Sequence, residues 1–181
     1  MKHAFLLVGM ILLASCNKNP EDKDHPIYKV IEKHEVLQLK NYKMKLVNAG
    51  IPERNQDNVE AIALHYVTFS KMKIPQVRKL IVCNVEQMLY LVNNNEEVES
   101  YLKKHPLTYN DIKFNIGFGD IEGEFQEPPH IAYAYLREGK IYYCYHDAIF
   151  GDFTEEKDVE EDYETALKIV KGELPKKVDS D

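Results

Sequence analysis

The stretch IAYAYLREGKIYYCY, residues 131–145, decides the fold. It consists of two runs, 131–136 and 141–145, in which side chains alternate along the chain between two kinds of surface. Such alternation is typical of β-strands, whose successive side chains point to opposite faces. Four residues, Arg137 to Lys140, separate the runs and include a glycine, which predicts an antiparallel β-hairpin. If the two central residues form the turn, Arg137 pairs with Lys140.

The alternation sorts the hairpin side chains onto two faces of the predicted sheet. The smaller, more aliphatic set suits packing against helices and consists of Ala132, Ala134, Leu136, Ile141, Tyr143 and Tyr145. The other set consists of Tyr133, Tyr135, Tyr142, Cys144 and His146. If it faces outward, it forms an aromatic platform, and tyrosine suits a protein or glycan partner because its contact area is large and amphipathic. The alternative is that a second layer, for instance the first helix, covers these tyrosines.

Outward from the hairpin, the periodicity of apolar residues predicts the other elements. We expect helices at 27–42, 75–92, 96–104 and 158–170, and further strands at 44–48, 59–69 and 111–118. The resulting order is α-β-β-α-α-β-β-β-α. Because the strands come in runs joined by short turns, this order favours an α+β fold, with an antiparallel sheet of about five strands and helices packed mainly on one face. A doubly wound parallel sheet is the poorer alternative.

Three of these elements show which side chains should form the core. The helix at 75–92 has apolar residues at helical spacing, namely Val77, Leu80, Ile81, Val85, Met88 and Val92. The helix at 27–42 has Ile27, Val30, Ile31, His34 and Leu37 on one side. The strand at 111–118 places Ile112, Phe114, Ile116 and Phe118 on one face.

Length and charge bound the class of protein. The chain has 181 residues and a formal charge of −7. We expect one α+β domain at 26–174, followed by a disordered polar tail at 175–181. An acidic surface disfavours nucleic acid and bare anionic lipid as partners.

The first sixteen residues have the pattern of a signal peptide. Lys2 precedes an apolar run at 4–13, which is shorter than the roughly 20 residues that a spanning helix needs. The run ends in Leu13-Ala14-Ser15-Cys16, which resembles the lipobox of bacterial lipoproteins. The resemblance implies that residues 1–15 are a signal peptide removed by cleavage.

The same resemblance implies that Cys16 carries the lipid that anchors the protein stably in an envelope membrane. Residues 16–25 would then be the lipidated cysteine and a flexible tether. Asn17 stands where an aspartate would resemble an inner-membrane retention signal, so the outer membrane is slightly favoured.

The span 44–171 resembles a group of small, uncharacterised bacterial lipoproteins and secreted proteins. Three of the features that carry the resemblance are the segments 77–82, 139–143 and 163–167. They are packing and turn features, so the resemblance implies a fold and supplies no mechanism.

A histidine–carboxylate cluster is the first candidate for chemistry. Counting outward from the turn, His130 lies opposite Asp147, and Asp120 could join them where the strands enter the acidic loop at 119–129. Such a group could bind a transition metal or transfer protons. The alternative, which we favour, is an exposed cross-strand pair of small energy.

Two further features are weaker candidates. Alternating carboxylates at 120–124 could hold calcium, but their spacing does not fit an EF-hand, and a solvated acidic loop is the better interpretation. An oxidising compartment would allow a Cys83–Cys144 disulfide, but Cys83 falls off the apolar stripe of its helix. Two separate cysteines are the favoured alternative.

The sequence has no nucleophile elbow, no Walker loop, no zinc-protease motif and no Cys-x-x-Cys motif. We therefore expect a membrane-anchored envelope protein without a cofactor, which binds an envelope protein or a glycan. The alternative is a periplasmic hydrolase or metal-binding enzyme that uses His130 and Asp147.

Overall fold

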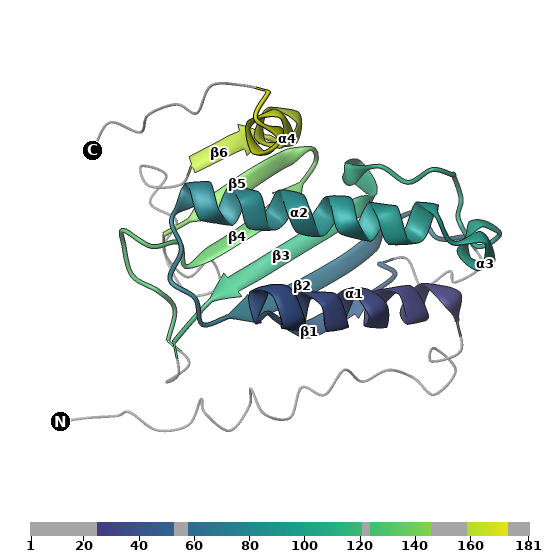
Figure 1. Ribbon diagram of the computed structural model, residues 1–181, viewed down its shortest axis with the longest axis horizontal. Helices are drawn as coiled ribbons and strands as arrows, with labels where there is room; N and C mark the ends of the chain where they lie inside the picture. Colours follow the sequence, from purple (N-terminus) through teal and green to yellow (C-terminus); the bar gives the residue numbers. More distant parts are fainter. Residues whose placement is uncertain (1–24, 53–57, 121–123, 146–158, 174–181) are drawn as a thin grey trace.

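The computed structural model describes residues 25–52, 58–120, 124–145 and 159–173. Within these ranges, four α-helices and six strands follow one another along the chain (Figure 1). They are α1 Pro26–Tyr42, β1 Lys45–Gly50, β2 Ile62–Thr68, α2 Ile74–Asn93, α3 Glu96–Glu99, β3 Ile112–Phe118, β4 Tyr133–Arg137, β5 Lys140–Cys144, β6 Val159–Asp162 and α4 Tyr163–Lys171, with a 3₁₀ turn, η2 Tyr109–Asp111, before β3. No helix among the described residues is both long and apolar enough to cross a membrane.

The six strands form one sheet in the order β1-β2-β3-β4-β5-β6. All neighbours are antiparallel except β2 and β3, which are parallel because α2 and α3 carry the chain back between them. The prediction of an α+β fold is confirmed, with six strands where about five were expected. Helices α1 and α2 lie across the same face of the sheet, and α4 lies beside β6 (Figure 1).

The hairpin has the register that the sequence predicts. Arg137 pairs with Lys140, so Glu138 and Gly139 form the two-residue turn. Both turn residues have positive φ, at 51° and 76°. Two positive φ angles are the signature of a type I′ turn, whose twist matches that of the strands it joins.

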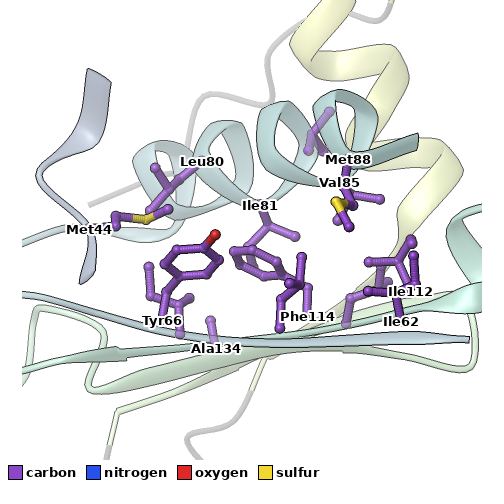
Figure 2. Packing of buried hydrophobic residues seen from close by; sticks show 14 of the residues in the cluster. Met44, Ile62, Tyr66, Leu80, Ile81, Val85, Met88, Ile112, Phe114 and Ala134 are labelled. Atoms are coloured by element: carbon purple, nitrogen blue, oxygen red, sulfur yellow. The ribbon is translucent and has the colours of Figure 1, made fainter. Parts of the chain in front are cut away.

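The core lies between the sheet and the helix layer. The six apolar residues predicted for α2 are all buried, as are the four predicted for β3. In Figure 2, Tyr66 and Phe114 point from the sheet toward α2, and the Tyr66 hydroxyl lies at the level of the helix layer. On α1, the predicted residues are buried except Leu37, which is half-buried, while Gln38 is fully buried.

Two predicted elements differ from the structure because backbone pairing competes with helix formation. Residues 159–162 belong to β6, which pairs with β5, so α4 begins at Tyr163 and not at 158. Helix α3 ends at Glu99, whereas 96–104 was predicted. Its continuation is prevented because Val59 donates from its amide to Tyr101 O at 2.8 Å and accepts from the Lys103 amide at 3.0 Å.

Candidate functional site

Among the described residues, the helices pack against one face of the sheet and no helix packs against the other, which we call the open face (Figure 1). Leu136 and Ile141, on the helix side, are at most 2% exposed. Tyr133, Tyr135 and Tyr142 lie on the opposite face and are half-buried. The predicted separation of the hairpin into two faces is therefore confirmed for these residues. The first helix packs against α2 and β1, so the tyrosines lie on the face that it does not cover.

Strand register aligns five polar side chains across this face. Asn48 pairs with His65, His65 with Asn115, Asn115 with Tyr135, and Tyr135 with Tyr142. We call these five residues the central row. Each comes from a different strand, from β1 to β5. The row therefore spans about 19 Å, or four intervals of about 4.8 Å.

The aromatic rings on the open face form one continuous chain of contacts. The Tyr135 and Tyr142 rings are stacked, with centroids 4.7 Å apart and planes at 14°. The Tyr133 ring lies 5.9 Å from that of Tyr135 and 6.1 Å from that of His65. Because such pairs stabilise each other beyond simple burial, the rings hold one another in place without help from the helix layer.

A glycine lies between the strands of Tyr133 and His65. Those two residues come from β4 and β2, and Gly117 of β3 lies opposite Tyr133 between them. A Cβ atom at Gly117 would lie 4.0 Å from the Tyr133 ring and 3.5 Å from the Phe125 ring. Both distances are those of ordinary van der Waals contacts, so the Tyr133 and Phe125 rings lie close to the backbone of β3 at Gly117.

Burial disfavours the charged forms of two rings on the open face, those of His65 and Tyr133. Loss of hydration lowers the pKa of His65 below its ordinary value and raises the pKa of Tyr133 to about 12. At neutral pH the His65 ring is therefore uncharged, and it can donate and accept hydrogen bonds beside the amides of Asn48 and Asn115 in the central row.

A hollow of about 340 Å³ adjoins the central row over β1, β2 and β3. Three of its lining residues, Asn48, His65 and Asn115, belong to the row. Gly50 and Ala63 also line it, and their small side chains leave the space above the strands. Its volume falls in the range of about 300–1,000 Å³ that is usual for small-ligand sites.

The other predicted candidates do not come together among the described residues. His146 and Asp147 lie outside the described residues, so the predicted tyrosine-face position of His146 and the predicted His130–Asp147 pair stay predictions. His130 is half-buried, and its backbone amide donates to Glu127 O at 3.0 Å. No group of three or more histidine, cysteine or acidic side chains in the described part of the chain could hold a metal ion.

Asp120 has a local structural role. Its carboxylate Oδ1 accepts from the Glu124 amide at 3.0 Å, and its own amide donates to Glu124 O at 2.8 Å. These two bonds close the loop that contains the alternating carboxylates. Residues 121–123 lie outside the described residues, so a calcium site formed by the carboxylates at 120–124 stays a prediction.

Cys83 and Cys144, the two cysteines among the described residues, do not form a disulfide. Cys83 lies on α2 in the helix layer, while Cys144 lies opposite Tyr133 on the open side of β5. The sheet therefore stands between the two thiols, as the favoured alternative of two separate cysteines expects. Burial and the nearby Cys83 thiol together raise the pKa of Tyr42.

A buried polar cluster lies on the helix side, and the sequence did not predict it. His34 Nε2 donates to Asn84 O at 3.1 Å, which leaves Nδ1 of the neutral ring to accept from Tyr66 Oη at 2.8 Å. The Gln38 amide nitrogen lies 3.2 Å from the same Nε2 and donates to Gln87. All but Gln87 are fully buried, so the cluster joins α1, α2 and β2 inside the core.

His34 was predicted as a core position only because it falls on the apolar side of its helix. The signal for a cluster was the pair His34 and Gln38, one helical turn apart. Loss of hydration lowers the pKa of His34 to about 4, against the opposite effect of the Asn84 carbonyl, so the ring is neutral at pH 7. The cluster is sealed in the core and does not contribute to the open face.

Comparisons with protein-family models, with curated proteins and with solved structures found no match to this chain. Any function assigned to it therefore rests on its own residues and their geometry.

Proposed function

We propose that this chain is a bacterial envelope lipoprotein whose α+β domain binds a partner through the open face of its sheet and catalyses no reaction. Cys16 would carry the lipid, and residues 1–15 would be removed. Residues 1–24 lie outside the described ranges, so this part of the proposal rests on the lipobox pattern. The outer membrane is the favoured location, with the domain facing the periplasm or the cell surface.

The open face is the observation that supports a binding role. An ordinary solvent-facing sheet surface carries scattered charged side chains. Here rings from three strands contact one another, with amides beside them and a hollow at one end. Half-buried tyrosines give a large contact area and lose little conformational entropy on binding, which is why interfaces are rich in them.

The proposed anchor also limits where the partner lies. From Cys16 to His25, where the described domain begins, nine peptide intervals span at most about 30 Å. The open face would therefore act close to the membrane that holds the lipid. A partner in the same envelope layer, either a protein or a glycan, fits this reach.

Capture from isolated envelopes tests the binding role. The lipidated protein and its Tyr135→Ala variant are each cross-linked in intact envelopes, and the captured components are quantified. Tyr90→Ala is the matched control, because Tyr90 is a 68% exposed tyrosine on α2 in the helix layer. We expect Tyr135→Ala to lose components that the native protein and Tyr90→Ala both retain.

Identical capture by all three proteins would refute a binding role for the open face. Anchorage is tested separately by labelling with a radioactive fatty acid. Cys16→Ser should abolish the label, and undiminished labelling would refute the lipid assignment.

A further inference from the structure

Charge is distributed unevenly between the open face and the rest of this acidic protein. The chain carries 30 acidic and 23 basic residues. On strands β1 to β5, however, the charged side chains that alternate onto the open face are all basic, namely Lys45, Lys113, Arg137 and Lys140. Glu160 and Asp162 are on β6, at the sheet edge. Both alternate onto the open face, so the described strands present four basic and two acidic side chains there, on a chain with a charge of −7.

Three of these cations form a second row beside the central row. Arg137 pairs with Lys140, and continuing the β3–β4 register by one residue places Lys113 opposite Arg137. Arg137 and Lys140 are neutralised in part, because Lys140 Nζ lies 2.6 Å from Glu160 Oε1 and Arg137 Nε lies 3.6 Å from Glu138 Oε1. Among the described residues, none forms an ion pair with Lys113.

Lys113 also lines the hollow. Asn115, two residues further along β3, stands beside it on the same face, and Asn48 lines the hollow from β1. An exposed ammonium that has no acidic partner in the described part of the chain, next to amide side chains, matches a ligand that combines an anionic group with uncharged hydrogen-bonding groups. The neutral, polar central row then continues from this point toward the tyrosines.

A saccharide fits this combination better than a peptide does. Peptide interfaces usually depend on large apolar anchors, whereas a group that enters this hollow meets the polar side chains of Asn48, Lys113 and Asn115. A sugar ring presents hydroxyl groups to amides and imidazoles, and its C–H surface contacts aromatic rings. The width of the row, about 19 Å across five strands, allows several linked sugar rings to bind side by side.

We propose that the open face binds an acidic saccharide, in which a carboxylate on a sugar pairs with Lys113 and the adjoining rings lie along the central row. This inference rests on the proposed binding function and names its ligand class.

Two matched pairs of saccharides test the proposal by ligand-observed NMR titration of the full chain in detergent. Trigalacturonic acid is compared with α-1,4-linked galactotriose, and 3′-sialyllactose with its carboxyl methyl ester, so that the members of each pair differ in the acidic group. We expect the acidic member of at least one pair to bind about fivefold more tightly than its neutral partner, as one partly exposed ion pair allows. Raising the salt concentration should reduce that preference.

Lysine variants show whether the preference comes from the proposed site. Lys113→Gln should remove the preference for the acid, while Lys29→Gln, an exposed lysine on α1 in the helix layer, should keep it. Tyr135→Ala should weaken binding of the acidic ligand about tenfold.

Each contrary result overturns a defined claim. Equal binding of acid and neutral partners, or equal effects of the two lysine variants, would overturn the role of Lys113. Failure of all four saccharides to bind would overturn the saccharide assignment. The proposed function fails separately, when Tyr135→Ala captures the same envelope components as the native protein.

Discussion

Lowering the pH from 7 to 4 should destabilise the native fold through His34, and a His34→Gln variant should lack this effect. The His34 ring is fully buried, and its Nδ1 and Nε2 are held by the Tyr66 hydroxyl and the Asn84 carbonyl. A proton added to this ring would place a positive charge in the core without an acidic partner in the cluster. Glutamine keeps a neutral amide there and does not titrate.

The magnitude follows from the difference in the pKa of His34 between the unfolded and folded states. The unfolded chain has the ordinary value of 6.5, and burial lowers the folded value to about 4. Between these values the unfolded state binds more protons, so stability falls as the pH falls. The contribution is fully present above pH 6.5 and is lost progressively down to about pH 4. A shift of about 2.5 units, at about 1.36 kcal/mol each, corresponds to roughly 3 kcal/mol.

Urea unfolding at pH 7, 6, 5 and 4, followed by circular dichroism, measures the effect. Carboxylates also lose stabilisation in acid, and burial lowers the pKa of His65 in the same direction, but both contributions occur in native protein and variant. The difference between the two free energies of unfolding should therefore change by roughly 3 kcal/mol in favour of the variant from pH 7 to 4. A constant difference, or an NMR-titrated pKa of His34 near 6.5, would refute the reasoning.

Two further predictions concern the hairpin. Ile141→Ala leaves a cavity in the core and should cost about 2–5 kcal/mol in chemical denaturation, whereas Tyr135→Ala removes a half-buried stacked ring and should cost about 1 kcal/mol. Similar losses would mean that the tyrosine face is a second core. Gly139→Ala should cost about 1–2 kcal/mol, because φ is +76° and its Cβ would lie 3.2 Å from Asn110 Oδ1. Gly50→Ala is the control, since nothing lies closer than 3.9 Å, and an equal loss in both would contradict the strain.

The sequence predicted the elements in which local pattern and tertiary packing agree. The turn residues Glu138 and Gly139 set the hairpin register, and alternation then placed Leu136 in the core and Tyr135 on the open face. The apolar stripe of α2 was equally informative, because a helix that covers a sheet needs one continuous buried side. In these segments short-range pattern alone is sufficient to assign the face of each residue.

Long-range pairing was not predictable in the same way. Strand β6 contains Val159 and three acidic residues, a composition that indicates the start of a helix, and only its hydrogen bonds to β5 make it a strand. Tyr143 of β5 donates a hydrogen bond to Glu161, and Arg78 Nε of α2 donates to the same carboxylate at 2.8 Å. Arg78 and Glu161 are 83 positions apart in the sequence, so no local sequence pattern could predict their contact.

The central row depends on one irregularity that alternation alone would assign wrongly. Leu46 pairs with Tyr66 on the core face, so an unbroken register would place Asn48 opposite Leu64, in the core. A β-bulge at Val47 shifts the pairing by one residue, so that Asn48 pairs with His65 on the open face, while Ala49 pairs with Leu64. The bulge therefore keeps the Asn48 amide out of the core and places it in the central row, beside the hollow. Because the extra residue lies in the edge strand β1, it changes the open face while the pairing of β2 with β3 remains regular.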